Sequence, residues 1–453
     1  MGSITSSYLM DTLKTFYAKE GVTSLLFKNS PTLETLHQEM VAGKTANFAA
    51  MYARSAGCGS NYQAVKEAVK RSGRVKEFQV TPANLFAAET FGAKELLASA
   101  ELKGAYLPIA ELKMFSACEG YRKTIAMALF GDGTGYIADL PSTDVDGASI
   151  TSIANNASVT IELPIYATMY IDIGSSLKVK SAKTDADDSK NITWEVTAID
   201  GQNVTIKNVS GSDYTVSGTP VITLAGAISP TGDKLIPTGL AGWLPTSVTS
   251  GESFFGVDRS IARDRLAGTH IAATASEKKY KTLQRAIAAV RRYGSKCDVI
   301  VMNDEDYLAM ASEIEDKTTF QKVDGGKGKS VAQVGFDSFG FSVVKNFLDN
   351  VIPDQYCPKG TAYVLDSSVV EVWAFNNALK VAKDGIGVEP GKPTVASGDA
   401  DKANRPHQLL VDEIFAVEDG EATEDGPASI VSIQTYLNFV VTNPSVCASV
   451  TLA

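Results

Sequence analysis

The sequence predicts an α+β protein in which a small β-rich domain is inserted between helical regions. Apolar residues recur at helical spacing over residues 108–130 and again over residues 275–293. Residues 141–235 are instead rich in Thr, Val, Ile, Asn, Gly and Ser and poor in helix-forming residues. After the second helix, a strand and a further helix follow in quick succession, which indicates a mixed fold.

The first strong helix is predicted over residues 108–130. Pro108 suits the first turn, where a missing N–H removes no hydrogen bond. Glycines at positions 131, 133 and 135 then end the helix, because they permit backbone angles that other residues avoid. One face of this helix is marked by Ile109, Leu112, Phe115, Cys118, Ile125 and Leu129.

A second strong helix is predicted over residues 275–293, with Ser276 as its cap and Gly294 at its end. Arg291 and Arg292 lie in the last turn, where the helix dipole favours cations. Its apolar face is formed by Tyr280, Leu283, Ile287 and Val290.

Shorter helices are predicted elsewhere. Asn303 and Asp304 begin one directly after a buried strand at Val299–Met302. Another runs from Leu9 to Ala18 in the polar first 30 residues. A third short helical pattern is formed by Pro31, Leu33, Leu36 and Met40.

Strands are predicted from alternation of apolar and polar residues. Alternation on both sides of a turn at residues 200–203 predicts a β-hairpin, and Phe78 with Val80 indicates part of another. The alternating residues of the first hairpin are Trp194, Val196, Ala198, Val204 and Ile206. Later strands are predicted over residues 221–224, 339–344, 361–365, 369–375, 429–442 and 446–452.

Composition excludes several classes of function. Of 453 residues, 44% are apolar and 21% are charged, which is an ordinary globular balance. The net charge of −10 leaves no overall basic footprint for gripping nucleic acid, although a container for DNA need only enclose it. No run approaches 18 apolar residues, so no transmembrane helix is predicted, and the start resembles no secretory signal.

Cysteine and histidine spacing predicts neither a disulfide framework nor a metal site. The five cysteines are scattered without a C-x-x-C pair, and the three histidines form no ligand pair. The cysteines are Cys58, Cys118, Cys297, Cys357 and Cys447, and the histidines are His37, His270 and His407.

Three short motifs resemble known binding sites but lack essential parts. The glycines at 131, 133 and 135 follow a helix rather than a strand and lack the spacing of a dinucleotide site. Residues 326–330, within a Gly- and Lys-rich loop at 318–335, lack the first glycine of a P-loop. Residues 144–147 are too short for a calcium loop. We therefore predict no catalytic residue, no cofactor-binding residue and no metal ligand.

Two charged segments have open interpretations. Lysines and arginines between Lys66 and Lys76 form either a solvated face or a partner-binding surface. Residues 412–425 contain seven acidic residues and no Lys or Arg, which favours a solvated acidic loop over a specific site for a basic partner.

The order of elements resembles the major capsid protein family of tailed phages, which has the Hong Kong 97-like fold. The helix ending in Ala126–Gly135 is similar to the family's spine helix and its closing turn. Gly239–Leu244 is similar to the return from the insert into the body. Further similar phrases are Cys297–Asn303, Phe339–Val344, Gly360–Asp366 and the closing Tyr436–Val446 segment with Pro444.

The resemblance implies seven segments. Residues 1–30 would be an N-terminal arm, residues 31–105 a short helix and an extended loop, and residues 106–140 the spine helix of a peripheral domain. Residues 141–235 would be the inserted β-rich domain. The remaining segments would be 236–295 of the peripheral domain, 296–428 as the axial domain and 429–453 as the C-terminal strand of the peripheral domain.

The resemblance also implies a function. The chain would assemble into pentamers and hexamers of an icosahedral phage head that encloses double-stranded DNA, in a virion built in the host cytoplasm. A portal protein and separate scaffolding or decoration proteins would be its partners. Because some family members carry a long cleaved scaffolding segment before the N-terminal arm, we expect either that this chain is the mature form or that scaffolding is a separate protein. No lysine–asparagine crosslink is predicted.

Three alternatives remain open. An encapsulin-type compartment shares this fold but holds protein cargo, and the β-rich insert favours a phage. A β-domain adhesion protein is disfavoured by the two strong helices and by the lack of a signal. An enzyme is disfavoured because no catalytic constellation is found.

Overall fold

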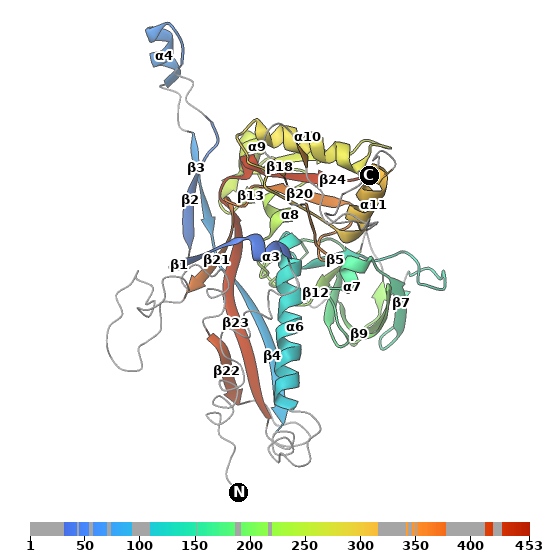
Figure 1. Cartoon of the computed structure of the whole chain (residues 1–453). Helices are drawn as coiled ribbons and strands as arrows, with labels where there is room; N and C mark the ends of the chain where they lie inside the picture. The colour runs from blue at the N-terminus through green and yellow to red at the C-terminus, as the bar shows by residue number, and fades with distance from the viewer. Residues whose placement is uncertain are drawn as a thin grey trace, which may run out of the picture. The chain divides into compact units, whose positions relative to one another are not determined.

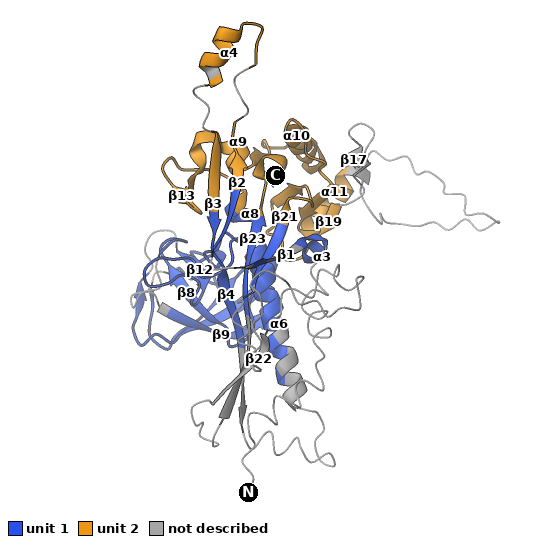
Figure 2. Cartoon of the chain, turned by 90° about the vertical axis from the view of Figure 1, so that its left-hand side faces the viewer, with its two compact units in different colours: residues 1–48, 79–242, 371–440 blue, residues 49–78, 243–370, 441–453 orange. Residues whose placement is uncertain are grey.

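The computed structural model describes residues 31–42, 45–53, 58–69, 74–92, 109–150, 152–185, 192–215, 220–315, 341–342, 347–348, 351–376, 413–419 and 428–453. Two compact units are formed, each from three separate segments of the chain (Figure 2). Unit 1 comprises residues 1–48, 79–242 and 371–440, and unit 2 comprises residues 49–78, 243–370 and 441–453. Their mixed helices and strands confirm the α+β class. The division into seven segments stays a prediction, and the predicted helix at 9–18 lies outside the described residues.

Unit 1 contains a five-stranded sheet built around β23 (Ala428–Val441). Its order is β1-β21-β23-β22, and β4 (Ala83–Gly92) also pairs with β23. β1 (His37–Ala42) runs parallel to β21 (Val370–Asn376), whereas β22 (Glu413–Asp419) and β4 run antiparallel to β23. Figure 1 shows α6 lying alongside β4 and β23.

Two predictions in this sheet are wrong. The short helix α3 (Pro31–Thr35) ends before Met40, which lies in β1 opposite Ala374 of β21. The acidic segment 412–425 is not a loop throughout, because its residues 413–419 form β22. In both cases pairing with a neighbouring strand outweighs the local sequence pattern, as is common for strands.

The helix predicted over residues 108–130 is confirmed as α6 (Ile109–Phe130). Tyr121, Ile125 and Leu129 follow one another at intervals of four, and all three are buried. The small residues Ala126 and Ala128 are also buried, so the last turns of α6 are covered on more than one side.

The β-rich segment forms a six-stranded sheet in the order β5-β12-β8-β9-β10-β7. Its strands are β5 (Tyr136–Asp139), β7 (Ser158–Glu162), β8 (Ser176–Lys180), β9 (Ile192–Asp200), β10 (Asn203–Asn208) and β12 (Val221–Leu224). β9 and β10 form the predicted hairpin, and its alternating residues Trp194, Val196, Val204 and Ile206 are buried, whereas Ala198 is exposed. A small pair, β6 (Ser152–Ile153) with β11 (Tyr214–Thr215), and α7 (Ile165–Thr168) complete this region.

Unit 2 contains a second five-stranded sheet, in the order β15-β24-β20-β16-β19. Its strands are β15 (Thr269–Ala272), β16 (Val299–Met302), β19 (Val351–Pro353), β20 (Thr361–Leu365) and β24 (Ala448–Thr451). Helices α10 (Lys279–Arg291) and α11 (Asp304–Glu315) pack their apolar residues into the same core as this sheet. The predicted helix, strand and helix of this region are thereby confirmed.

The start of α10 differs from the prediction. Ser276 has a φ of 66° and lies before the helix, so Lys278 occupies the cap position without a side-chain hydrogen bond. By contrast, Asn303 caps α11 as predicted, because its Oδ1 accepts a hydrogen bond from the Glu305 amide at 2.9 Å.

The remaining elements are short. They are β2 (Ala46–Met51), α4 (Tyr62–Val69), β3 (Val75–Val80), α8 (Leu240–Trp243), β13 (Ser253–Phe254), β14 (Val257–Asp258), η1 (Arg259–Ala262), α9 (Arg263–Leu266), β17 (Phe341–Ser342), β18 (Phe347–Leu348) and η2 (Pro444–Val446).

Candidate assembly interface

Residues 46–80 expose apolar side chains on a two-stranded ribbon. They are here called the arm, which is distinct from the predicted N-terminal arm at residues 1–30. β2 pairs with β3, and α4 lies between them in the chain (Figure 1). Tyr62 is 74% exposed and Met51 is 66% exposed, and Val69 and Val75 are exposed as well. A two-stranded ribbon alone is marginally stable in water. The arm is therefore a candidate surface for contact with another molecule.

The base of the arm is held by aromatic packing within unit 2. Phe78 of β3 is fully buried, and its ring centroid lies 5.4 Å from that of Trp243. Trp243 in turn lies 5.0 Å from Phe254 in an edge-to-face arrangement. The guanidinium carbon of Arg259 lies 3.7 Å from the Phe254 ring centroid, and burial lowers the pKa of Arg259 to about 10. Phe78, predicted as part of a hairpin, lies in strand β3, and its side chain is buried in this cluster.

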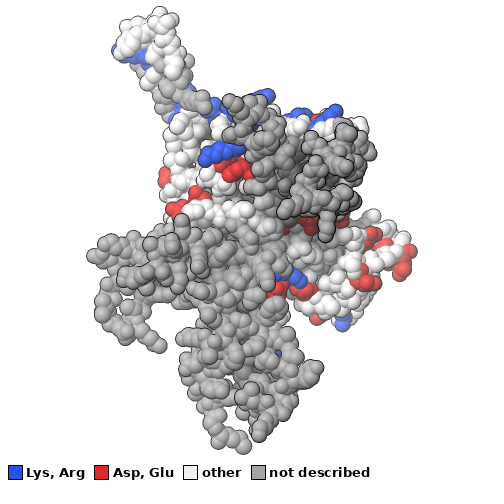
Figure 3. Space-filling model, in the orientation of Figure 1, with Lys and Arg blue, Asp and Glu red and all other residues white. Residues whose placement is uncertain are grey.

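The basic run lies on the arm. Lys66 is exposed on α4, whereas Arg74 and Lys76 are partly buried at the start of β3. Figure 3 shows basic side chains on the arm, in the orientation of Figure 1. Lys70 and Arg71 lie outside the described residues, so the choice between a solvated face and a binding surface stays open.

Two buried polar side chains of β23 in unit 1 are hydrogen-bonded within the subunit. The Asn438 side chain of β23 accepts a hydrogen bond from the Thr238 amide at 2.9 Å and donates one to the Thr81 carbonyl at 2.8 Å. Thr435 of the same strand hydrogen-bonds the Tyr121 hydroxyl of α6, and burial raises the pKa of Tyr121 well above its usual value. These bonds fix α6 and β23 in one framework.

Glycines in and near the turn after α6 allow neighbouring segments to pack closely. Gly135 has a φ of +66°, and a Cβ added there would meet Ala227 and Ile236. A Cβ added at Gly239 would collide with the carbonyl oxygens of Ala128 and Leu129 at the end of α6. The phrase Gly239–Leu244 is thus explained by its close approach to the helix end.

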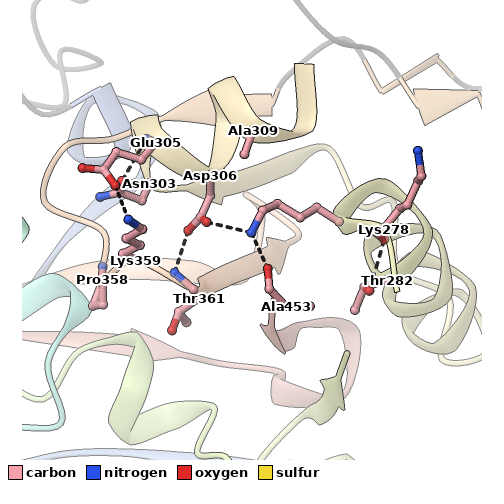
Figure 4. Close-up of polar contacts among 12 residues, drawn as sticks. Lys278, Thr282, Asn303, Glu305, Asp306, Ala309, Pro358, Lys359, Thr361 and Ala453 are labelled. Carbon is pink, nitrogen blue, oxygen red and sulfur yellow. Dashed lines mark hydrogen bonds and ion pairs between the residues drawn. The ribbon is translucent and has the colours of Figure 1, made fainter. Parts of the chain in front are cut away.

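A buried ionic network in unit 2 joins distant segments (Figure 4). Asp306 of α11 is 2% exposed and accepts hydrogen bonds from Lys279 Nζ at 3.1 Å and from the Gly360 amide at 2.6 Å. Lys279 also donates to the Ala453 carbonyl at 2.5 Å. Because the acid and the lysine satisfy one another, the network holds α10, α11 and the end of the chain together.

The titratable residues in the described part of the chain show no arrangement typical of catalysis or metal binding. Among those residues, no group of His, Cys, Asp and Glu is placed to hold a metal ion. Cys297, Cys357 and Cys447 are buried thiols, and burial raises the pKa of Cys447 to about 12, which disfavours a reactive thiolate. His270 Nδ1 lies 3.1 Å from Ser449 Oγ, and burial lowers the pKa of His270.

The calcium-loop-like residues 144–147 form an ordinary turn. Asp144 accepts a hydrogen bond from the Ala148 amide at 2.7 Å and closes an exposed turn that contains Gly147. Residues 326–330 and His407 lie outside the described residues. None of the helices within the described ranges is long and apolar enough to cross a membrane.

Sequence reasoning missed the exposed apolar residues of the arm. Val75 precedes Phe78 and Val80 in one strand, yet Val75 is exposed and the other two are buried. Successive side chains of a strand point to opposite faces, so Val75, three positions from Phe78, lies on the face opposite to Phe78 and Val80. Within the described residues β2 and β3 form a two-stranded sheet, and the sequence did not show that the face bearing Val75 is exposed.

No protein-family model matches the sequence, and no curated protein matches it. Solved structures with a similar chain trace include capsids and an encapsulin. The cyanophage A-1(L) capsid asymmetric unit has a TM-score of 0.48 and 11% identity, covering 93% of this chain and 92% of that chain. The capsid of the native GTA particle has a TM-score of 0.40 and 9% identity, covering 95% and 90%.

The holo-SrpI encapsulin complex from Synechococcus elongatus PCC 7942 has a TM-score of 0.37 and 8% identity, covering 92% of this chain and 84% of that chain. All three TM-scores lie below 0.5, so these are similarities of chain trace alone.

Proposed function

We propose that this chain is the major capsid protein of a tailed phage, with the Hong Kong 97-like fold that the sequence resemblance implies. The observation that supports a shell role is the arm, which is anchored at Phe78 but exposes Met51 and Tyr62. In this proposal the arm lies on a second copy of the chain, which buries those side chains. Burying one such side chain contributes about 1.5–3 kcal/mol.

Shell assembly follows from repeating this contact. An arm that binds the body of the next copy makes a heterologous contact, and such contacts form closed shells when their geometry closes. Each subunit then makes several contacts, so modest individual affinities combine through multivalency. The subunits would form pentamers and hexamers around double-stranded DNA, together with a portal protein and separate scaffolding or decoration proteins. The role is structural rather than enzymatic.

Negative-stain electron microscopy of the purified protein, alone and with the products of its neighbouring genes, tests the shell role. Closed icosahedral particles, or uniform rings of five and six subunits, are the expected result. A monomer or small fixed oligomer that persists with those partners present contradicts the proposal.

Surface variants test the role of the arm. M51S and Y62S in one chain should leave the subunit folded, because both side chains are exposed, but should abolish particles. The matched control is I173S, whose side chain is 68% exposed outside the arm. Loss of particles in the control but not in the arm variant would assign assembly to the insert instead.

The particle contents distinguish a phage head from an encapsulin-type compartment. A phage head co-expressed with its packaging partners should protect DNA from added nuclease. Particles that instead retain one protein cargo and no DNA would establish the compartment and reject the phage reading.

A further inference from the structure

Helix α10 has two chemically opposite faces. Leu283, Ala286, Ile287 and Val290 are fully buried in the core of unit 2. On the opposite side, Lys278, Lys281, Arg285 and Arg292 follow one another at intervals of three, four and seven residues, which places them in one line along a helix. We call these four residues the basic stripe.

The basic stripe is accessible. Lys281, Arg285 and Arg292 are exposed, and Lys278 is partly exposed. Between Arg285 and Arg292 this line passes Ala288, whose small side chain does not cover the neighbouring cations. At a rise of 1.5 Å per residue the stripe is about 20 Å long. Basic side chains line the upper edge of Figure 3, over the region where Figure 1 labels α10.

The local charge opposes that of the whole chain. Residues 277–296 contain seven Lys and Arg and one acidic residue, Glu277, in a chain with a net charge of −10. Glu277 pairs with Arg285, whose side chain nevertheless remains 48% exposed. Lys279 is the cation that points inward to Asp306, and Figure 4 shows Lys278 directed away from that network. The stripe is therefore a positive line on an acidic protein.

The chemistry of the stripe favours phosphate groups over a protein partner. Protein interfaces place aromatic, apolar and arginine anchors at their centres and are depleted in lysine. The exposed positions of α10 are instead Lys281, Gln284, Arg285, Ala288 and Arg291, none of them a large apolar residue. A nucleic-acid backbone requires cations and polar groups, with no apolar anchor.

We propose that the basic stripe of α10 binds the phosphate backbone of nucleic acid without sequence specificity. Its four cations would each displace counterions, so the logarithm of the binding constant should fall with the logarithm of salt concentration with a slope of about −3 to −4. Within the proposed phage head the stripe would give an otherwise repelling subunit a local contact with enclosed DNA. The binding itself does not require a shell.

Fluorescence anisotropy of the full-length subunit with a labelled random-sequence DNA duplex, measured from about 50 to 200 mM salt, tests the proposal. The variant K281Q/R285Q/R292Q should lose about three units of slope and at least tenfold in affinity at the lowest salt. The control K66Q/R74Q/K76Q removes three cations from the arm and should bind like the wild type. R292Q alone, the mildest change, should lose about one unit of slope.

The possible outcomes distinguish DNA binding by the basic stripe from contact of the stripe with a second copy of the chain. Equal losses in the stripe variant and the arm control, or no binding by the wild type, overturn the proposal. If the stripe variant binds DNA normally but no longer forms particles, the stripe contacts an acidic surface of a second copy, and the proposal is again wrong. If the wild type forms no particles but its DNA binding depends on the stripe, the shell role fails and this inference stands.

Discussion

Gly135 illustrates how a single residue closes the turn after α6. Its backbone is left-handed, and an added Cβ would lie 2.9 Å from Ile236 Cδ1 and closer still to Ala227. We expect G135A to lower the free energy of unfolding by about 2–5 kcal/mol, because left-handed strain and overpacking add.

Gly147 is the matched control for that change. Its φ is +83°, yet no atom lies within 4 Å of an added Cβ, so G147A should cost only about 1–2 kcal/mol. Urea denaturation of the soluble subunit measures both variants, and equal losses would show that the predicted clash at position 135 is relieved by movement.

The lowered pKa of Asp366 implies that unit 2 loses stability as the pH becomes acidic. Burial alone would raise the pKa of Asp366, but hydrogen bonds from Ser368 Oγ at 2.5 Å and from the Lys296 amide at 3.0 Å outweigh it and lower the pKa below 3.8. A lowered folded-state pKa stabilises the protein above the unfolded value and loses that effect as pH falls through the folded value. The wild type should therefore exceed D366N in stability at pH 7, and the difference should shrink by pH 3. A difference in urea midpoints that stays constant between those two pH values would contradict this.

At the scale of elements, the cap of α11 joins the helix to the loop between β19 and β20. Asn303 Oδ1 accepts from the Glu305 amide, and its Nδ2 donates to the Cys357 carbonyl at 2.7 Å. We expect N303A to lower the free energy of unfolding by about 2–3 kcal/mol, since a cap and a buried hydrogen bond are lost together. S312A, at an exposed site of the same helix, should change it by less than about 0.5 kcal/mol. Thermal unfolding distinguishes the two, and equal shifts would reject the capping role.

Elements with strong local patterns could be predicted from the sequence. The helices over 109–130 and 279–291 and the hairpin of β9 and β10 follow from periodicity that packing then uses. β1 and β22 could not be predicted, because Met40 and the acidic residues of 413–419 adopt strands only through pairing with β21 and β23. Local signals are weakest where a distant strand decides the conformation.

The candidate interfaces were harder to predict than the fold. The sequence indicated a basic run between Lys66 and Lys76 and placed Arg291 and Arg292 at the end of a helix. The predicted apolar face of this helix implied a solvent-facing side, but the line that Lys281 and Arg292 share on it was not drawn from the sequence. Exposure of Tyr62 depends on the ribbon around it.

At the scale of the molecule, neither unit corresponds to one continuous stretch of chain. Unit 2 requires β24, which lies between β15 and β20 in its sheet. Val450 is fully buried there, whereas Thr451 beside it is exposed. An unpaired charge in such a core typically unfolds a protein with 5–15 kcal/mol of stability.

We therefore expect V450D to destroy the protease resistance of unit 2, while T451D, one residue further on, leaves it intact. Limited proteolysis followed by mass mapping of the cut sites measures this. Intact fragments from unit 2 in V450D would show that the sheet tolerates the loss of its inner strand.

The position of β24 also determines when, during synthesis, the sheet of unit 2 can be completed. A ribosome completes β20 more than 80 residues before it reaches β24, a delay of roughly 4–17 s at 5–20 residues per second. Throughout that interval β15 and β20 lack the strand that separates them in the finished sheet. A nascent chain therefore cannot complete the sheet of unit 2 until β24 itself has been made.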